Sequence, residues 1–227
     1  MMTLLYSLVL LTQPGLAEDY ISADRPSVAV GSSVVGTRKT QLETGLQIDL
    51  IDGSHSFSIP TTFRYGLTDN IEVRVTSPLY SLNATSIQNI LQSTIVEGNV
   101  NFYKSSNASV GGMLGVLVND QILNASAALL VDVSSGPYSG WLNVIGNLGS
   151  ADIDSIYPSF AIGGGSLLYK SHGVFVETSG SVQSGISGTV QAGYFWLSPN
   201  LQIDFYVQQS YTAPEVLTIG IGGAWKR

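Results

Sequence analysis

Charged residues of both signs alternate with apolar residues in the first third of the chain. Four of them fall on the polar parity of three predicted strands: Glu43, Arg64, Glu72 and Arg74. Opposite charges on neighbouring strands can pair, so we expect these side chains to share one face of a sheet. On the wall of a channel, such charges would also select solutes. Both interpretations stay open, a structural salt-bridge network or a selective constriction, and Glu97 joins the candidates from a later strand.

Catalytic and metal chemistry have little support in the sequence. The two histidines, His55 and His172, each lie beside a serine in a predicted turn. A serine hydrolase would need a serine next to a histidine that Asn or Asp orients, and no such set stands out. Asp152 and Asp154 could hold Ca²⁺ in a loop, but two carboxylates also fit a solvated loop. We predict no catalytic residue, no metal and no cofactor.

Composition favours a membrane β-barrel. Charged residues make up only 11% of the 227 residues, and the mean hydropathy is +0.25. No apolar run reaches the ~18 residues that a membrane helix needs. A net charge of −7 argues against nucleic acid as a partner, and the absence of cysteine excludes disulfides. The alternative, a soluble β-sandwich or lipocalin-like barrel, would normally carry more charge on its solvent face.

Strict alternation of apolar and polar residues predicts the strands that carry the charges. Asp52 and Gly53 suit a two-residue type I′ hairpin turn. Centring the first hairpin there places Ile48 opposite Phe57, with both on the apolar face. The sheet therefore has one apolar and one polar face.

The next turn determines how the charges would meet. We centre the turn at residues 66–70 on Thr68. This register pairs Phe63 with Val73 and puts Arg64 directly across from Glu72, which would make a cross-strand ion pair.

The N-terminus has the features of an export signal followed by a short polar stretch. Residues 1–17 have an apolar core and a small-residue end, which is the layout of a cleaved signal peptide. Residues 18–37 show no sustained period. We expect them to form a periplasmic arm or a plug that folds into the lumen, with a disordered leader as the alternative.

The remaining chain continues as alternating strands, about twelve in all, so residues 38–227 form the barrel domain. The fold class is all-β, an antiparallel up-and-down transmembrane barrel. We expect a turn at residues 134–140 and a bulge at the three glycines of 163–165.

Four aromatic residues end alternate strands on the apolar parity, at one rim of the predicted barrel: Tyr65, Phe102, Trp196 and Trp225. An aromatic girdle is expected where a lipid-facing wall meets the headgroups. The apolar parity therefore faces lipid and the polar parity faces the lumen. Met113, Leu117 and Leu130 also fall on the inner parity and give the lumen an apolar wall.

Three short runs resemble the "MetA-pathway of phenol degradation" family of outer-membrane transporters. They are Asp-Arg-Pro at 24–26, Gln-Leu-Glu-Thr-Gly at 41–45 and Arg-Tyr-Gly-Leu-Thr-Asp at 64–69, which occur in that family in this order. The resemblance implies an outer-membrane barrel that passes hydrophobic or aromatic compounds. It covers about the first third of the mature chain. Barrels of this kind usually end in an aromatic residue, whereas Trp225 here precedes two basic residues.

Together these features predict a bacterial outer-membrane channel for passive passage of small molecules. Its expected partners are the lipid bilayer, the barrel-assembly machinery and a small-molecule solute. The alternative is a non-conducting structural or surface-interaction barrel whose lumen is blocked by residues 18–37. The sequence does not identify the solute.

Overall fold

Alternating residues form twelve long strands in the computed structural model. The structure describes residues 21, 23–24, 29–83, 86–88, 94–118, 123–148, 156–182, 186–212 and 215–227. The predicted signal peptide, part of the predicted arm or plug, and the loop with Asp152 and Asp154 lie outside these residues. No helix among the described residues is long and apolar enough to cross a membrane.

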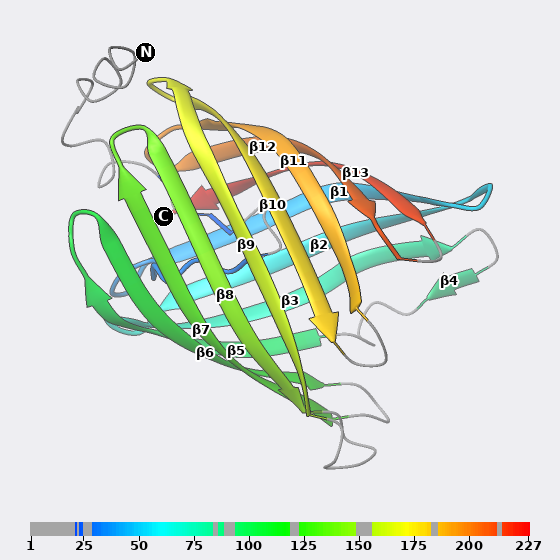
Figure 1. Ribbon diagram of the computed structural model, residues 1–227. Helices are drawn as coiled ribbons and strands as arrows, with labels where there is room; N and C mark the ends of the chain where they lie inside the picture. Colours follow the sequence, from blue (N-terminus) through cyan, green and yellow to red (C-terminus); the bar gives the residue numbers. More distant parts are fainter. Residues whose placement is uncertain are drawn as a thin grey trace, which may run out of the picture.

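The strands pair with their neighbours in sequence and close into a ring (Figure 1). Closure comes from β13, which pairs antiparallel with β1. A short strand, β4, extends the far end of β3. The strands are β1 (Thr40–Ile51), β2 (Ser54–Gly66), β3 (Ile71–Asn83), β4 (Ser86–Gln88), β5 (Thr94–Lys104), β6 (Ala108–Val118), β7 (Leu123–Ser135), β8 (Tyr138–Leu148), β9 (Ile156–Tyr169), β10 (His172–Val182), β11 (Ile186–Leu197), β12 (Leu201–Ser210) and β13 (Val216–Lys226). The predicted fold class, a twelve-stranded antiparallel barrel, is confirmed.

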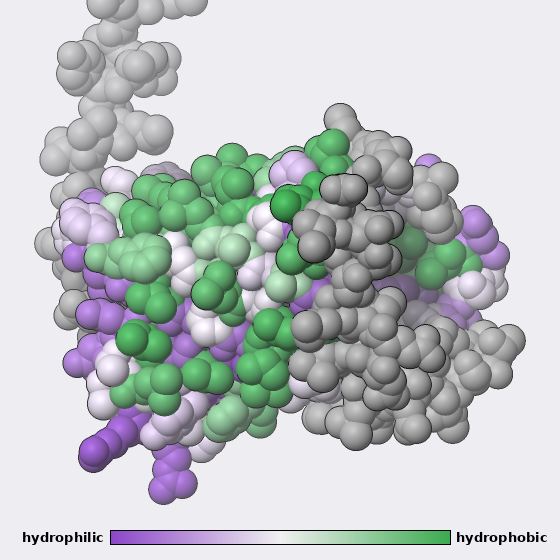
Figure 2. Space-filling view, turned by 90° about the horizontal axis from the view of Figure 1, so that it is seen from below, coloured by the Kyte–Doolittle hydropathy of each residue, from purple (hydrophilic) through white to green (hydrophobic). Residues whose placement is uncertain are grey.

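Burial follows the period of two along each strand. Leu114, on the outer wall, is 70% exposed, whereas Leu130 on the inner parity is fully buried. Hydrophobic side chains spread over the outer wall in the view of Figure 2. The long strands run for 10 to 14 residues, enough for the ~9–11 residues that a tilted membrane strand needs. The wall is therefore apolar outside and polar inside.

One end of the barrel carries the tight turns at residues 67–70, 105–107, 136–137, 170–171 and 198–200, together with the last residue of β13. We call this the short-turn end. Residues 29–37 also lie there, inside the barrel (Figure 1). The β1–β2 hairpin turn lies at the opposite end.

The first hairpin has the predicted register, and the second does not. Ile48 faces Phe57, and Asp52 has the positive φ that the tight turn requires. In the second hairpin Arg64 faces Arg74 rather than Glu72. The N–H groups of Leu67 and Thr68 both donate to the carbonyl of Ile71, at 2.9 and 3.1 Å, which centres the loop on Asp69.

Phe63 therefore faces Val75 instead of Val73. The centre of the turn moves by one residue, so the pairing shifts by two. A two-residue shift keeps every side chain on its predicted face.

One predicted turn is shorter than expected, and two other local predictions were wrong. The turn predicted at 134–140 is present, but the strands extend into it and leave only residues 136–137 between them. The glycines at 163–165 pair regularly, and the irregularity lies between His172 and Gly173. Both His55 and His172 belong to strands rather than turns. Pairing across the barrel sets these boundaries, and turn-forming residue types do not reveal it.

Candidate functional site

The four charged candidates converge inside the barrel at the short-turn end. Glu43 comes from β1, Arg64 from β2, and both Glu72 and Arg74 from β3, three strands that lie side by side. All four are at most 2% exposed. They meet because each occupies an inward position near the same ends of adjacent strands.

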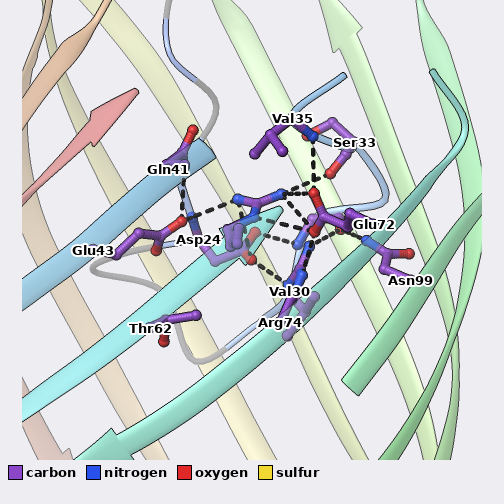
Figure 3. A network of polar contacts seen from close by, with 12 residues as sticks. Asp24, Val30, Ser33, Val35, Gln41, Glu43, Thr62, Glu72, Arg74 and Asn99 are labelled. Carbon is purple, nitrogen blue, oxygen red and sulfur yellow. Dashed lines mark hydrogen bonds and ion pairs between the residues drawn. The ribbon is translucent and has the colours of Figure 1, made fainter. Parts of the chain in front are cut away.

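Arg64 is the centre of this charge cluster, whose other members Glu43, Glu72 and Arg74 are labelled in Figure 3. Its Nη1 donates to Glu43 Oε1 at 3.0 Å, and its Nε and Nη2 donate to the two oxygens of Glu72, each at 3.1 Å. The carboxylate of Asp24 lies 3.5 Å from Nη1. Although the register differs from the prediction, Arg64 still pairs with Glu72 diagonally.

Arg74 links the cluster to the segment before β1. It donates to Glu72 and to Asp24. Gln41 Nε2 donates to Glu43 at 2.8 Å. Two guanidinium groups are thus surrounded by three carboxylates that lie 0–15% exposed. Removing one member of a buried ion-pair network leaves an uncompensated charge, which typically costs ~3–5 kcal/mol.

Glu97 lies on the edge of the charge cluster. It belongs to β5, where it sits directly opposite Arg74 in the register. Its side chain is half-buried, unlike those of the central residues. Both residues occupy inward parities, so the predicted candidate set forms one continuous inner surface.

Residues 29–37, which we call the N-terminal segment, cross the lumen beside the charge cluster. Val30 contacts Asn143 of β8, and Ser32 contacts Asp132 of β7. Val35 N–H donates to Glu72 at 2.8 Å. The segment therefore spans from one side of the barrel to the other at the short-turn end.

Thr37, the last residue of the N-terminal segment, is hydrogen-bonded to the β2–β3 turn. Its N–H and Oγ1 donate to Asp69 Oδ1 at 3.2 and 2.6 Å. These hydrogen bonds from Thr37, assisted by the charge of Lys39, hold the pKa of the Asp69 carboxyl below its ordinary value.

A cavity of about 400 Å³ lies between the N-terminal segment and the wall. Trp141, Phe175 and Phe195 are among its lining residues. The indole N–H of Trp141 donates to Glu177 Oε2 at 2.6 Å. Trp141, Phe175, Glu177 and Phe195 lie on inward parities that the alternation of residues indicates, but no sequence motif marks them as a set. Their meeting depends on the pairing of β8 to β11.

The four predicted girdle residues lie toward the short-turn end and point outward. Tyr65, Phe102 and Trp225 are 37%, 68% and 49% exposed, and Trp196 is partly exposed. Tyr65 precedes the β2–β3 turn, and Trp196 faces His172 at the start of β10. Their role as membrane-interface residues stays a prediction.

Comparison with known proteins found structural neighbours only. No protein-family model and no curated protein matches the sequence. An outer-membrane channel from Pseudomonas putida F1 matches with a TM-score of 0.66 and 9% identity, over 88% of this chain and 100% of that chain. The NanC porin matches with a TM-score of 0.63 and 7% identity, over 80% and 98%. The KdgM porin in complex with disordered oligogalacturonate matches with a TM-score of 0.61 and 11% identity, over 81% and 98%.

The fold is that of outer-membrane channels. These neighbours are porins and channels rather than enzymes. At identities this low the structural similarity establishes the fold alone, and function has to be argued from the particular residues. The resemblance to the "MetA-pathway of phenol degradation" family stays a prediction.

Proposed function

We propose that this protein is a bacterial outer-membrane channel for passive passage of small molecules. The observation that carries the proposal is the closed barrel of twelve long strands, apolar outside and polar inside. A closed barrel satisfies every backbone hydrogen bond within the wall, as a membrane requires. The shared fold with outer-membrane channels supports the same assignment.

The solute we favour is small and apolar or aromatic. The cavity beside the N-terminal segment supports this choice, because Trp141, Phe175 and Phe195 contribute aromatic rings to its lining. Aromatic rings on such a wall can stack with a flat apolar molecule. Its volume of about 400 Å³ fits a molecule of that size.

Solute flux tests the proposal directly. Purified protein in liposomes should release an entrapped small aromatic compound faster than empty liposomes do, and protein in planar bilayers should give current steps. Absence of both flux and current from folded protein would contradict the channel assignment. The cellular counterpart is fractionation with the outer membrane and slower gel migration after boiling, as expected for a protein folded by the barrel-assembly machinery.

The second candidate is a non-conducting structural or surface-interaction barrel. The N-terminal segment favours it, because contacts with strands on both sides place the segment across the lumen. Deleting residues 18–37 separates the candidates. A plug predicts a large rise in conductance, whereas an arm that leaves the passage free predicts no change. Heat-dependent migration of the deletion variant serves as the check that its barrel is folded.

A further inference from the structure

The backbone of residues 29–35 is bound by side chains of the barrel wall. The contacts come from six strands, β2, β3, β5, β7, β8 and β10. Wall side chains therefore bind this stretch much as a binding groove binds a ligand.

Four N–H groups of the stretch donate to the wall. Ala29 donates to Glu177 at 3.2 Å and Val30 to Asn143 Oδ1 at 2.8 Å. Ser32 donates to Asp132 at 2.7 Å, and the fourth donor is the Val35 N–H on Glu72 described above.

Four carbonyl oxygens of the same stretch accept from the wall. The carbonyl of Val30 accepts from Asn143 Nδ2 at 2.8 Å, so this one amide holds both polar groups of one peptide residue. The carbonyls of residues 31, 32 and 33 accept from Asn99 at 3.2 Å, Asn101 at 2.9 Å and Arg64 at 2.9 Å. Paired donors and acceptors of this kind recognise a peptide backbone whatever its side chains.

A glycine in the wall also leaves space for Ser32 of the stretch. Gly111 of β6 faces Ser32, and a Cβ at Gly111 would come within 3.2 Å of the Ser32 Cβ. Ser32 is completely buried. The site therefore admits small residues at its centre.

We propose that this inner wall is a binding site for a peptide backbone, occupied in cis by residues 29–35, and that short peptides of small residues bind it in trans. The proposal rests on the proposed channel function, since a trans peptide must reach the lumen. Its ligand class differs from the apolar solutes of the adjacent cavity, because main-chain hydrogen bonds provide the recognition.

The test uses the full chain with substitutions that weaken the binding of residues 29–35 to the wall and leave the wall residues unchanged. The V30P/S32P variant removes two of the four donating N–H groups, because proline carries none. V34P is the matched control, since no hydrogen bond from the Val34 N–H is among the contacts that the structure describes. We expect V30P/S32P to conduct several-fold more than the parent protein and V34P to conduct like the parent.

The probe is the acetylated and amidated peptide Ala-Val-Gly-Ser-Ser-Val-Val, the sequence of residues 29–35. It should bind V30P/S32P in detergent by calorimetry and reduce its current in bilayers. A peptide N-methylated at the positions of Val30 and Ser32 should bind at least about tenfold more weakly. Adding N143L to V30P/S32P should weaken binding of the unmodified peptide by a similar factor. E177Q provides a milder second variant if the N143L protein does not fold.

The outcomes separate this inference from the channel assignment. Current without peptide binding, or equal binding of both peptides, overturns the inference and leaves the channel function standing. Selective binding without any current supports the peptide site and contradicts the channel function. Selective binding together with block of the current supports both.

Discussion

Arg64 shows how a single residue organises the inside of this barrel. It is fully buried and lies within 3.5 Å of three carboxylates, one from the segment before β1 and two from neighbouring strands. A buried guanidinium is tolerated only where carboxylates and hydrogen bonds replace water. The charge cluster thus joins Asp24 to the wall by ion pairs, and it joins the N-terminal segment to the wall by hydrogen bonds to the backbone of Ser33 and Val35.

Replacing Arg64 should destabilise the folded barrel. In Arg64→Gln, Glu43 and Glu72 lose their shared cation and remain buried, which should lower the free energy of unfolding by ~3–5 kcal/mol. Urea titration of the protein in lipid vesicles measures the change. Lys170→Gln, at an exposed turn position, is the control and should change it little. An equal effect of the two substitutions would show that the charge cluster does not stabilise the barrel.

The link between Thr37 and Asp69 should depend on pH. The folded pKa of Asp69 lies below its unfolded value, so the stabilisation is complete above the unfolded pKa and is lost as pH falls through the folded pKa. An NMR titration of the Thr37 amide in micelles should show a midpoint below the ordinary aspartate value of ~3.9. Asp69→Asn should abolish that midpoint, and its persistence in the variant would assign the titration to another group.

At the scale of elements, large inward side chains lie against glycines on adjacent strands. A Cβ on Gly163 of β9 would lie 2.7 Å from the indole of Trp141 in β8. A Cβ on Gly193 of β11 would likewise overlap the ring of Phe175 in β10. These glycines allow bulky rings to lie against the wall and leave room for the cavity.

Adding a methyl group at Gly163 should therefore disturb the aromatic wall. Gly163→Ala should cost ~1–3 kcal/mol, the usual effect of overpacking, and should shift the fluorescence of Trp141 as its indole moves away from Glu177. Gly98→Ala is the matched control, since a Cβ there has no atom within 4 Å. Similar stability and spectra for the two variants would contradict the packing argument.

For the whole molecule, the balance of charge inside the barrel is negative. Among described residues, the carboxylates on inward parities are Glu43, Asp49, Glu72, Glu97, Asp132, Glu177 and Asp204. The cations on inward parities are Arg64, Arg74 and, at the rim, Lys104 and Lys226. Clustered charges of one sign raise the local concentration of counter-ions. The inner wall should therefore concentrate cations and repel anions.

The proposed channel should accordingly pass K⁺ more readily than Cl⁻. Reversal potentials in asymmetric KCl should give a permeability ratio above one, and the preference should weaken at high salt because charges are screened. Asp49→Asn should lower the ratio, since Asp49 accepts hydrogen bonds only from neutral donors among the described contacts. Asp52→Asn, in the exposed turn of the same hairpin, should leave the ratio unchanged. A preference for Cl⁻ would contradict the charge argument.

The sequence alone determined the barrel and the direction of its side chains. Alternation with a period of two depends only on local backbone geometry, so the inward parity of Arg64, Glu72 and Met113 was readable without a partner strand. The Asp52-Gly53 turn was equally local. A register error of two residues at the next turn left this pattern untouched.

Only the tertiary structure decided which inward side chains meet. The loop centred on Asp69 set Arg64 opposite Arg74, and the pairing of β8, β9 and β10 brought Trp141 to Glu177. The sequence of residues 29–37 has no periodic pattern that predicts their path, because side chains of distant strands hold them in place. Contacts between residues more than a hundred positions apart, such as Val30 with Asn143, come from closure of the barrel, and local pattern holds no record of them.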